Sequence, residues 1–381
     1  MKFLLIYVPN LRFSYKGDWS KRKLNEICQF FKGNGLSKSD LSNEGFPCIL
    51  YGELYTTYKN EVIRDIISKT NTTLSNPFLS RNNDLIIPGS GEDPIDIAVA
   101  RAIYQNDIIL GGDLNILRPK SNVSAAFLSY QLNGVRRYDI AKKAQGKSIV
   151  HLHNSDLKEV LVSIPTYDEQ LHIAKLLTKI DEMIETQSKI INDYKILKNH
   201  IIKSFIKQNG TSYLLSEIAE LGRGRVINSA EISKQKNPIY PVYSSQTSNN
   251  GIMGYLDNYD YEGEYITWTT DGANAGTVYY RNGKFNCTNV CGILKIKNGY
   301  DAYYISNILN CYTKKYVSTN LANPKLMNNV MANIKINLPS IEQQKHSSKI
   351  LQSIEYRVEI EEDIKLNLVK QKAFLLKNMF I

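Results

Sequence analysis

The chain has 381 residues, enough for two or three domains, and 43% of them are apolar, as in globular proteins. Its formal net charge of +10 favours a polyanionic partner over an acidic or purely apolar one. No apolar run approaches the length of a transmembrane helix, which argues against a membrane protein.

Cysteine usage and the N-terminal residues indicate where the protein works. Five cysteines, at positions 28, 48, 287, 291 and 311, form no CxxC pair, so we expect free thiols in a reducing compartment rather than a zinc site. The apolar stretch at residues 3–8 ends at Pro9 and is too short for a signal peptide. These features predict a cytoplasmic protein.

Residues 1–158 are predicted to form a first domain that mixes helices and strands. A short helix at Lys23–Ile27 is followed by a glycine turn at Lys32–Gly35. A second helix is expected at Ala125–Leu132. The predicted strands, separated by Gly and Pro, are Pro47–Tyr51, Asp84–Pro88, Asp107–Leu110, Ile116–Leu117 and, before the next segment, Val160–Ile164.

Residues 159–208 are predicted to form one long helix that begins after Pro165. Apolar residues recur there with a 4-3 spacing over about four heptads, which is typical of a coiled coil. Eight of the ten seam positions are apolar: Ile173, Leu177, Ile180, Ile184, Gln187, Ile191, Tyr194, Lys198, Ile201 and Phe205.

Residues 209–333 repeat the order of the first domain. A short helix at Leu214–Ile218 precedes a second glycine turn, at Gly222–Arg225. Ala302–Tyr312 is the expected helix. The predicted strands are Tyr240–Tyr243, Glu264–Thr269, Thr277–Tyr280, Cys291–Ile296 and, before the last segment, Ile334–Leu338.

Residues 334–381 are predicted to form a second long helix that copies the first. A shift of 174 positions aligns Pro165 with Pro339, Gln170 with Gln344 and His172 with His346 without a gap. Polar residues recur in the same seam positions, Gln187 with Glu361 and Lys198 with Lys372. So long an offset indicates two copies of a large unit. Each helix would be roughly 50–60 Å long and act as a spacer.

The positive charge lies mainly outside these two helices. Residues 160–206 carry no net charge and residues 334–381 carry +2, which leaves +8 of the +10 on the two segments that the helices separate. We therefore expect those segments to meet the polyanion.

The order of these features resembles the specificity subunit of type I restriction–modification systems. The resemblance rests on the sequence from Pro9 to Phe13, on Trp19 with the Lys23–Ile27 stretch, on the strand–Pro–Glu-Gln entry to each long helix, and on the half-length repeat. It covers the whole chain. Trp19 has no counterpart in the second domain, where Tyr213 stands nearby, so the exact start of that domain stays open.

This resemblance implies a fold, a function and partners. The fold is α+β, with two similar target-recognition domains separated by two long helices packed as an antiparallel coiled coil. Each domain reads one half of a bipartite site on double-stranded DNA, and the chain docks methyltransferase subunits, expected to be two, and restriction/translocase subunits. S-adenosylmethionine, ATP and Mg belong to those partners, so this chain itself is expected to hold no cofactor or metal and to catalyse nothing.

Several motifs resemble those of enzymes, but their context favours scaffold roles. Phe31–Gly35 matches the FxGxG loop of adenine methyltransferases, and Asn237–Tyr240 half-matches its Asn-Pro-Pro-Tyr partner. The stretch before the first motif is expected to be helical where a strand is required, and the second motif lies in the other repeat. Gly146-Lys147-Ser148 lacks the opening glycine of a phosphate loop, where Ala141 stands. His151, His153, His172 and His346 are expected to cap or pack.

Base edges are read by polar side chains, so the DNA-contacting residues should lie on polar loops near basic residues. In the second domain the uncharged, amide-rich Ser244–Gly251 loop is the leading candidate, with Gln246 as an expected base reader. The predicted contacts there are Ser244, Ser245, Gln246, Thr247, Asn249, Asn250, Thr270, Arg281, Lys284 and Asn286. In the first domain they are Tyr51, Glu53, Tyr55, Thr57, Tyr58, Lys59 and Ser90. Predicted phosphate contacts are Lys32, Lys38, Lys142, Lys143, Lys147, Arg223 and Arg225.

Two other functions remain open from the residues alone. The chain could be a coiled-coil assembly scaffold whose basic domains bind protein, which predicts no salt-sensitive DNA binding. It could also be a stand-alone methyltransferase, which predicts binding of S-adenosylmethionine by the isolated chain.

Overall fold

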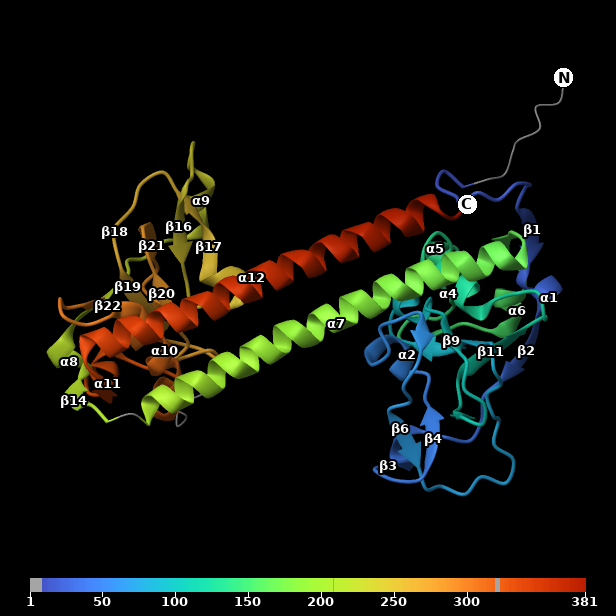
Figure 1. The fold of residues 1–381 in the computed structure, drawn as a ribbon, viewed down its shortest axis with the longest axis horizontal. Coiled ribbons are helices and arrows are strands. Elements are labelled where there is room, and N and C mark those ends of the chain that lie inside the picture. Colours follow the sequence, from blue (N-terminus) through green and yellow to red (C-terminus); the bar gives the residue numbers. More distant parts are fainter. Residues whose placement is uncertain (1–8, 208, 319–322) are drawn as a thin grey trace. The chain divides into compact units, whose positions relative to one another are not determined.

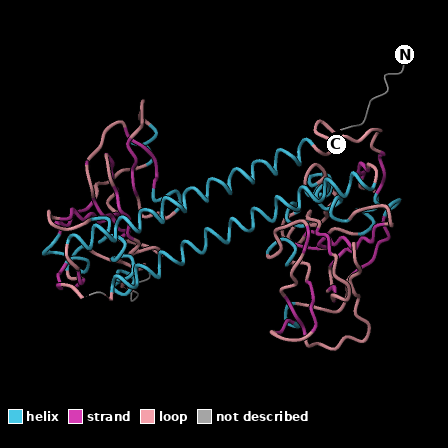
Figure 2. Tube along the Cα trace, in the orientation of Figure 1, coloured by secondary structure: helices cyan, strands magenta, loops and turns pink. Residues whose placement is uncertain are grey.

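The computed structural model describes residues 9–207, 209–318 and 323–381, which form two compact units (Figure 1). Unit 1 comprises Met1–Lys189 and Glu362–Ile381, and unit 2 comprises Ile190–Glu361. The boundary cuts both long helices, α7 (Tyr167–Ile206) and α12 (Ile341–Asn378). The apolar stretch at residues 3–8 lies outside the described residues. Both units mix helices and strands, as the colouring of Figure 2 shows.

Unit 1 is built on a five-stranded sheet. Its strand order is β2 (Cys28–Lys32), β11 (Leu114–Pro119), β7 (Asp84–Pro88), β9 (Arg101–Ile103) and β5 (Val62–Ile63). Every residue of the central strand β7 is buried, as its unbroken apolar run from Leu85 to Ile87 requires. Helix α4 (Ala125–Asn133) packs against β7 and β9.

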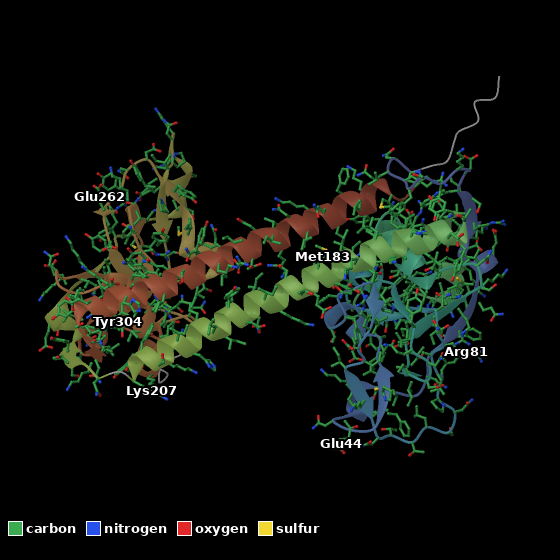
Figure 3. The ribbon with its side chains drawn as sticks, viewed as in Figure 1. Glu44, Arg81, Met183, Lys207, Glu262 and Tyr304 are labelled. Carbon is green, nitrogen blue, oxygen red and sulfur yellow. The ribbon has the colours of Figure 1, made fainter. Side chains whose placement is uncertain are left out.

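A smaller sheet extends from unit 1. Its order is β10 (Ile109–Leu110), β4 (Phe46–Ile49), β6 (Ser68–Thr70) and β3 (Leu41–Ser42). Figure 3 labels Glu44, in the turn between β3 and β4, at the end of this sheet furthest from the main one.

Three aromatic side chains from distant parts of the sequence meet in the core of unit 1. The ring of Phe127 lies 5.7 Å from Trp19 and 5.3 Å from Phe380, between ring centroids. Met379 and Phe380 are almost fully buried, so the last residues of the chain complete this core. Burying a large apolar side chain contributes roughly 1.5–3 kcal/mol.

Unit 2 repeats this plan with a main and a small sheet. The main sheet has the order β15 (Ala219–Arg223), β22 (Cys291–Ile296), β19 (Tyr265–Thr269) and β20 (Val278–Arg281). The small sheet has the order β17 (Ile252–Leu256), β16 (Tyr240–Tyr243), β21 (Lys284–Cys287) and β18 (Tyr261–Glu262). Helix α10 (Ala302–Tyr312) packs against β19 and β20, and its Tyr304, labelled in Figure 3, is fully buried.

The duplication extends to strand pairing. Each unit opens with a strand that pairs antiparallel with the strand before a long helix: β1 (Ser20–Lys23) with β13 (Leu161–Ile164), and β14 (Thr211–Leu214) with β23 (Lys335–Leu338). One-turn helices α1 (Leu24–Ile27) and α8 (Leu215–Ile218) follow the opening strands. Each small sheet also contains one parallel pair, β4 with β10 and β16 with β21.

The repeated Pro and Gln at the helix starts have one structural purpose. Gln170 Nε2 donates to Pro165 O at 3.1 Å, and Gln170 Oε1 accepts from Ser124 N at 2.9 Å. In unit 2, Gln344 Nε2 donates to Pro339 O at 2.9 Å. Gln344 Oε1 accepts from Asp301 N at 3.0 Å. Each buried glutamine therefore ties the start of a long helix to the N-cap of α4 or α10.

The predicted seam is confirmed, because none of the ten seam residues of α7 is exposed, and the matched positions Glu361 and Lys372 of α12 are not exposed either. Lys372 Nζ lies 2.6 Å from Asp181 Oδ1 within unit 1, and Lys198 pairs with Glu355 within unit 2. The two ion pairs are equivalent in the repeat, because a shift of 174 positions aligns Lys198 with Lys372 and Asp181 with Glu355. Leu376 packs in the cluster of Leu177, and Ile202 in that of Leu351, so the helices run antiparallel within each unit.

Two local predictions are wrong. A strand, β2, leads directly into the FxGxG-like motif and contains Lys32, the expected first residue of the glycine turn, because helix α1 ends after one turn at Ile27. Gly222 lies inside strand β15, paired with Ile293, rather than in a turn. The division into segments 1–158, 159–208, 209–333 and 334–381 stays a prediction.

Candidate DNA-binding interface

The amide-rich loop of unit 2 is a closed turn that follows strand β16. Ser244 N donates to Gly251 O at 2.9 Å and so joins its two ends. The loop ends in the 3₁₀ segment η2 (Ser248–Gly251), where Asn249 and Asn250 have φ values of 48° and 51°. Asparagine tolerates this left-handed region better than most residues. The side chains of Thr247, Asn249 and Asn250 are exposed.

Contacts within the chain brace this loop. Gln246 Nε2 donates to Ile252 O at 2.5 Å, so the expected base reader also holds the loop closed. Asn274 Nδ2 donates to Thr247 Oγ1 at 3.3 Å. The structure therefore brings together the two polar loops that the sequence singled out, 244–251 and 269–274.

Arg281 lies beneath the loop and not on the surface. Only 4% of the residue is exposed, and its guanidinium carbon lies 3.5 Å from the ring centroid of Tyr243 and 4.4 Å from that of Tyr279. Nη2 donates to Asn250 O at 2.9 Å, and Nε donates to Thr267 Oγ1 at 3.3 Å. Burial lowers the pKa of Arg281 from its usual value. The arginine thus supports the loop from inside.

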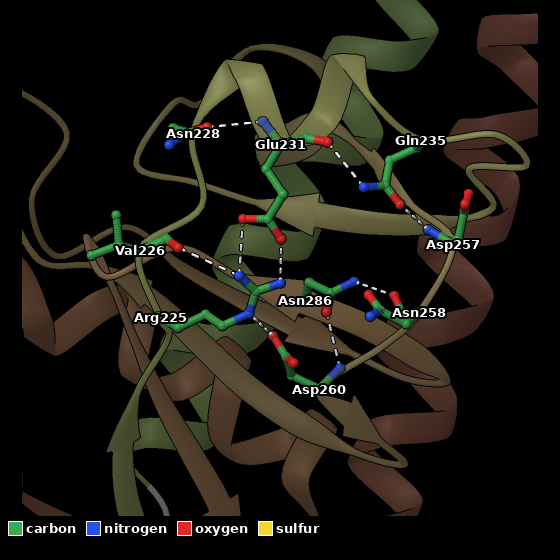
Figure 4. Close-up of polar contacts among 9 residues, drawn as sticks. All are labelled: Arg225, Val226, Asn228, Glu231, Gln235, Asp257, Asn258, Asp260 and Asn286. Atoms are coloured by element: carbon green, nitrogen blue, oxygen red, sulfur yellow. Dashed lines mark hydrogen bonds and ion pairs between the residues drawn. The ribbon is translucent and has the colours of Figure 1, made fainter.

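Asn286, Thr270 and Ser244 are also buried. Asn286 Nδ2 donates to Asn258 O at 2.8 Å, and its Oδ1 accepts from Asp260 N at 2.9 Å (Figure 4). Thr270 Oγ1 donates to Val290 O at 2.9 Å. Their side chains are enclosed and hydrogen-bonded within the chain, and that they contact DNA stays a prediction.

Arg225 does not present a free positive charge. Glu231 binds its guanidinium with two hydrogen bonds of 2.6 and 3.1 Å, and Asp260 accepts from Nε at 3.0 Å (Figure 4). These carboxylates raise the pKa of Arg225, and the arginine lowers that of Glu231. Arg223 is exposed, and its only described side-chain bond goes to Met327 Sδ at 3.4 Å. Arg223 therefore fits a phosphate contact better than Arg225 does.

The remaining predicted residues of unit 2 lie at or near the surface. Ser245 is half-buried, and Lys284 is exposed with its Nζ 3.7 Å from Glu262 Oε1 and 4.5 Å from the Tyr259 ring. Figure 3 labels Glu262 on this small sheet.

In unit 1 the predicted readers gather around the one-turn helix α2 (Glu53–Thr56). Glu53 Oε2 accepts from Leu50 N at 2.7 Å, and Tyr58 OH accepts from Ile67 N at 3.2 Å. Ser90 is buried and donates to Asp113 Oδ2 at 3.1 Å. Like Asn286, these three residues hold the local chain.

Four other residues of this group can reach solvent. Thr57 and Lys59 are exposed, and Tyr51 and Tyr55 are half-buried. Lys59 Nζ donates to Tyr55 O at 3.1 Å.

The predicted phosphate contacts of unit 1 are open to solvent. Lys32, Lys38, Lys142 and Lys147 are exposed, and Lys143 is half-buried. Across residues 9–207, 209–318 and 323–381, none of these lysines forms an ion pair with a carboxylate. Their charges are therefore available to an anion.

Of the motifs that resemble enzyme sites, the FxGxG-like loop is packed against its own chain, whereas residues 237–239 of the Asn-Pro motif are exposed. A Cβ on Gly33 would overlap the carbonyl oxygen of Gly111, and Asn34 accepts from Phe78 N at 2.9 Å. Asn237 N donates to Asp257 Oδ1 at 2.8 Å in the other unit.

Within the described residues, no three His, Cys, Asp or Glu side chains are grouped to hold a metal. The five cysteines are free thiols, as expected. No described helix is long and apolar enough to cross a membrane.

Sequence reasoning missed the aromatic clamp formed by Tyr243 and Tyr279. A signal was present, because Tyr279 and Arg281 are two residues apart on a strand and therefore share one face. Tyr243 belongs to another strand, and no local pattern predicts its approach.

Comparisons with known proteins agree with this architecture. A family model described as the type I restriction modification DNA specificity domain matches residues 16–194 and 210–371. A Mycoplasma pneumoniae chain named as the N-terminus of a type I specificity subunit is 43% identical over 142 residues, which are 37% of this chain and 75% of the relative. The specificity subunit of the M. pneumoniae type I restriction enzyme MpnII is 42% identical over 146 residues, 38% of this chain and 43% of that one.

Solved structures share the fold. The type I restriction–modification S subunit from M. genitalium matches with a TM-score of 0.69 and 18% identity, over 98% of this chain and 99% of that chain. A chain from a structural study of complex assembly in a type I restriction–modification system matches with a TM-score of 0.57 and 13% identity, over 96% and 98% of the two chains. With its two matched domains, two long helices and α+β units, this chain belongs to the type I restriction–modification specificity subunit family.

Proposed function

We propose that this chain selects the DNA sequence on which a type I restriction–modification complex acts, with each unit reading one half of a bipartite site. The observation that carries the proposal is the duplication: the two units share four main-sheet strands in the same order and one parallel pair in each small sheet, but carry unlike loops. A common scaffold with different polar loops suits the reading of two different short sequences.

The charge and polarity of the loops support DNA as the ligand. The exposed Thr247, Asn249 and Asn250 offer uncharged donors and acceptors, which base edges require. The unpaired lysines of unit 1 and Arg223 of unit 2 offer charges to phosphates, which fix register and orientation.

The outer faces of the long helices support the docking of methyltransferase subunits, expected to be two. Within unit 1, α12 exposes Ile364, Leu366, Val369 and Phe374, and Phe374 is 61% exposed. Unit 1 also has a groove of about 820 Å³ beside α7, lined by Val62, Ile63, Tyr104, Leu171 and Ala174 among others. Exposed apolar side chains on α12 and an apolar groove beside α7 suit contact with another protein.

Catalysis belongs to the partners in this proposal. Adenine N6 methylation, for which S-adenosylmethionine supplies the methyl group, and base flipping both fall to the methyltransferase subunits, and ATP with Mg serves the restriction/translocase subunits. The support is that the FxGxG-like loop is packed against its own chain. The complex would act in the cytoplasm, where it meets DNA.

The test is to map N6-methyladenine in the genome of the host and of a strain that lacks this chain. We expect a motif of two short specific halves around an unspecified gap, present only when the chain is present. A methylation pattern that survives the deletion unchanged would overturn the proposal.

Binding measured on the assembled complex provides an independent check. Affinity for a duplex that carries the motif should fall steeply with salt, because phosphate contacts release counterions. Affinity that does not change with salt would favour a protein-binding scaffold.

A further inference from the structure

The three amide side chains of the Ser244–Gly251 loop differ in what they bind. The amino group of Gln246 donates to Ile252 O, and Asn249 Nδ2 makes a long bond of 3.5 Å to the same oxygen. The side chain of Asn250 is exposed and makes no hydrogen bond to any described residue. Asn250 is therefore the amide of this loop that is free to bind a ligand.

The main chain of Asn250 is, by contrast, firmly held. Its carbonyl oxygen accepts from Arg281 Nη2 at 2.9 Å, and the guanidinium is clamped between Tyr243 and Tyr279. No described carboxylate forms an ion pair with Arg281. A buried guanidinium is costly unless its donors and faces are satisfied, and here the loop carbonyl and two aromatic faces satisfy it.

We propose that Asn250 reads an adenine in the half-site of unit 2, and that Arg281 is the positioning residue that presents it. This inference rests on the proposed function. An asparagine amide offers one donor group and one acceptor side by side, which match N7 and N6 of adenine in the major groove. The loop carries no charged side chain, so it adds no positive charge that would favour phosphate over a base edge.

The geometry explains why arginine stands at position 281. A planar fork can lie flat between two rings and still donate from its edge, whereas a lysine ammonium cannot do both. A Cβ on Gly251 would lie 3.1 Å from Nη2, so the loop backbone fits closely over the guanidinium. Fixing the Asn250 backbone in this way reduces the entropy lost when its side chain binds.

The experiment compares Asn250→Gly with its neighbour Asn249→Gly in the assembled complex. Glycine suits the left-handed φ at both positions, so both variants keep the loop backbone and the carbonyl that Arg281 binds. Binding is measured on a library of duplexes randomised across the wild-type motif. Asn250→Gly should lose about tenfold of the preference for adenine at one position of one half-site. Asn249→Gly should keep that preference.

Arg281 variants test the positioning role. Arg281→Lys should relax the same base position, and the double variant Asn250→Gly with Arg281→Lys should discriminate no worse than Asn250→Gly alone. Tyr279→Phe keeps the ring and should keep the preference. As a control, each variant complex should keep the wild-type base preference in the half-site read by unit 1, which shows that the complex is assembled and folded.

Each outcome decides the inference. Unchanged preference in Asn250→Gly, or a loss that falls equally on Asn249→Gly, overturns the assignment of Asn250. Additive losses in the double variant overturn the role of Arg281. If the wild-type complex itself shows no bipartite preference, the proposed function fails, and this result is distinguishable because it appears before any substitution.

Discussion

Two glycines in the main sheet of unit 2 have very different surroundings. A Cβ on Gly292 would overlap the buried indole ring of Trp268, whereas a Cβ on Gly222, on the neighbouring strand β15, would meet no atom within 4 Å. Neither glycine has a positive φ, so backbone conformation does not explain Gly292. It is needed because the indole occupies the space of a side chain.

We therefore expect Gly292→Ala to destabilise the protein by about 1–3 kcal/mol through overpacking. Gly222→Ala should change the free energy of unfolding by less than about 0.5 kcal/mol. Thermal unfolding of the full chain, followed by tryptophan fluorescence, would measure both. Equal stability of the two variants would contradict the close packing of the Trp268 indole against Gly292.

A buried acid in unit 1 gives the stability a pH dependence. Burial, and then the negative charge of Glu61, raises the pKa of Asp181 to about 6, against the attraction of Lys372. The folded chain then binds a proton at Asp181 more tightly than the unfolded chain does. Between pH 4 and pH 6 this group therefore makes stability fall as pH rises.

Asp181→Asn should remove this fall, because the amide does not titrate. The free energy of unfolding of the variant, relative to the wild type, should rise by ~1–3 kcal/mol between pH 4 and pH 7. Urea unfolding at several pH values is the measurement. A difference that stays constant across this range would show that Asp181 titrates normally.

At the scale of elements, the two repeat-related ion pairs of the long helices differ in how deeply they are buried. The Lys372 side chain is 16% exposed and lies 2.6 Å from both Glu61 and Asp181, which are 8% and 6% exposed. Its counterpart Lys198 pairs with Glu355, which is 41% exposed.

Lys372→Met should cost roughly 3–5 kcal/mol, since it leaves two buried carboxylates without the lysine that pairs with both of them. Lys198→Met should cost less than about 1 kcal/mol, because solvent screens that pair. Chemical unfolding of both variants, with the exposed Lys370→Met as control, separates the two cases. Similar losses in the free energy of unfolding for Lys372→Met and Lys198→Met would show that burial does not determine how much each ion pair contributes.

Much of this element structure follows from local sequence. The seam residues, the strand Cys291–Ile296 and the helix Ala302–Tyr312 were predictable, because periodicity and composition act over a few residues. The repeat predicted the matched glutamines Gln170 and Gln344. Strand β2 was not predicted, because it follows directly after the one-turn helix α1. Four helical residues are too few to show a helical periodicity, so the end of the helix could not be located.

The candidate interface was less predictable than the fold. The Ser244–Gly251 loop stood out by composition, but Gln246 and Asn250 have equivalent side-chain chemistry in a sequence. Only the structure shows that the Gln246 amide braces the loop through Ile252 O, whereas Asn250 is held by its main chain and not by its amide. Similarly, Arg225 and Arg223 look alike until Glu231 and Asp260 are seen to neutralise the first.

At the scale of the whole molecule, the proposed function makes the long helices determine the gap of the DNA site. Inserting one heptad into both helices preserves the 3.5-residue seam and adds ~10.5 Å to each. We expect the gap in the methylated motif to lengthen by about three base pairs, with both halves unchanged. Methylation mapping after the insertion measures this, and an unchanged gap would show that the helices are not the ruler.

The burial of Met379 and Phe380 in unit 1 has a consequence for how the protein is made. A ribosome synthesises Met1–Lys189 long before it reaches Glu362–Ile381. At about 5–20 residues per second, the delay between the two segments of unit 1 is roughly 10–40 s. During that time the nascent first half has no residue to fill the space beside Trp19 and Phe127. Ile190–Glu361 is contiguous and meets no such delay. The unit that is synthesised later can therefore complete its core first, and loss of Met379 and Phe380 should destabilise unit 1 rather than unit 2.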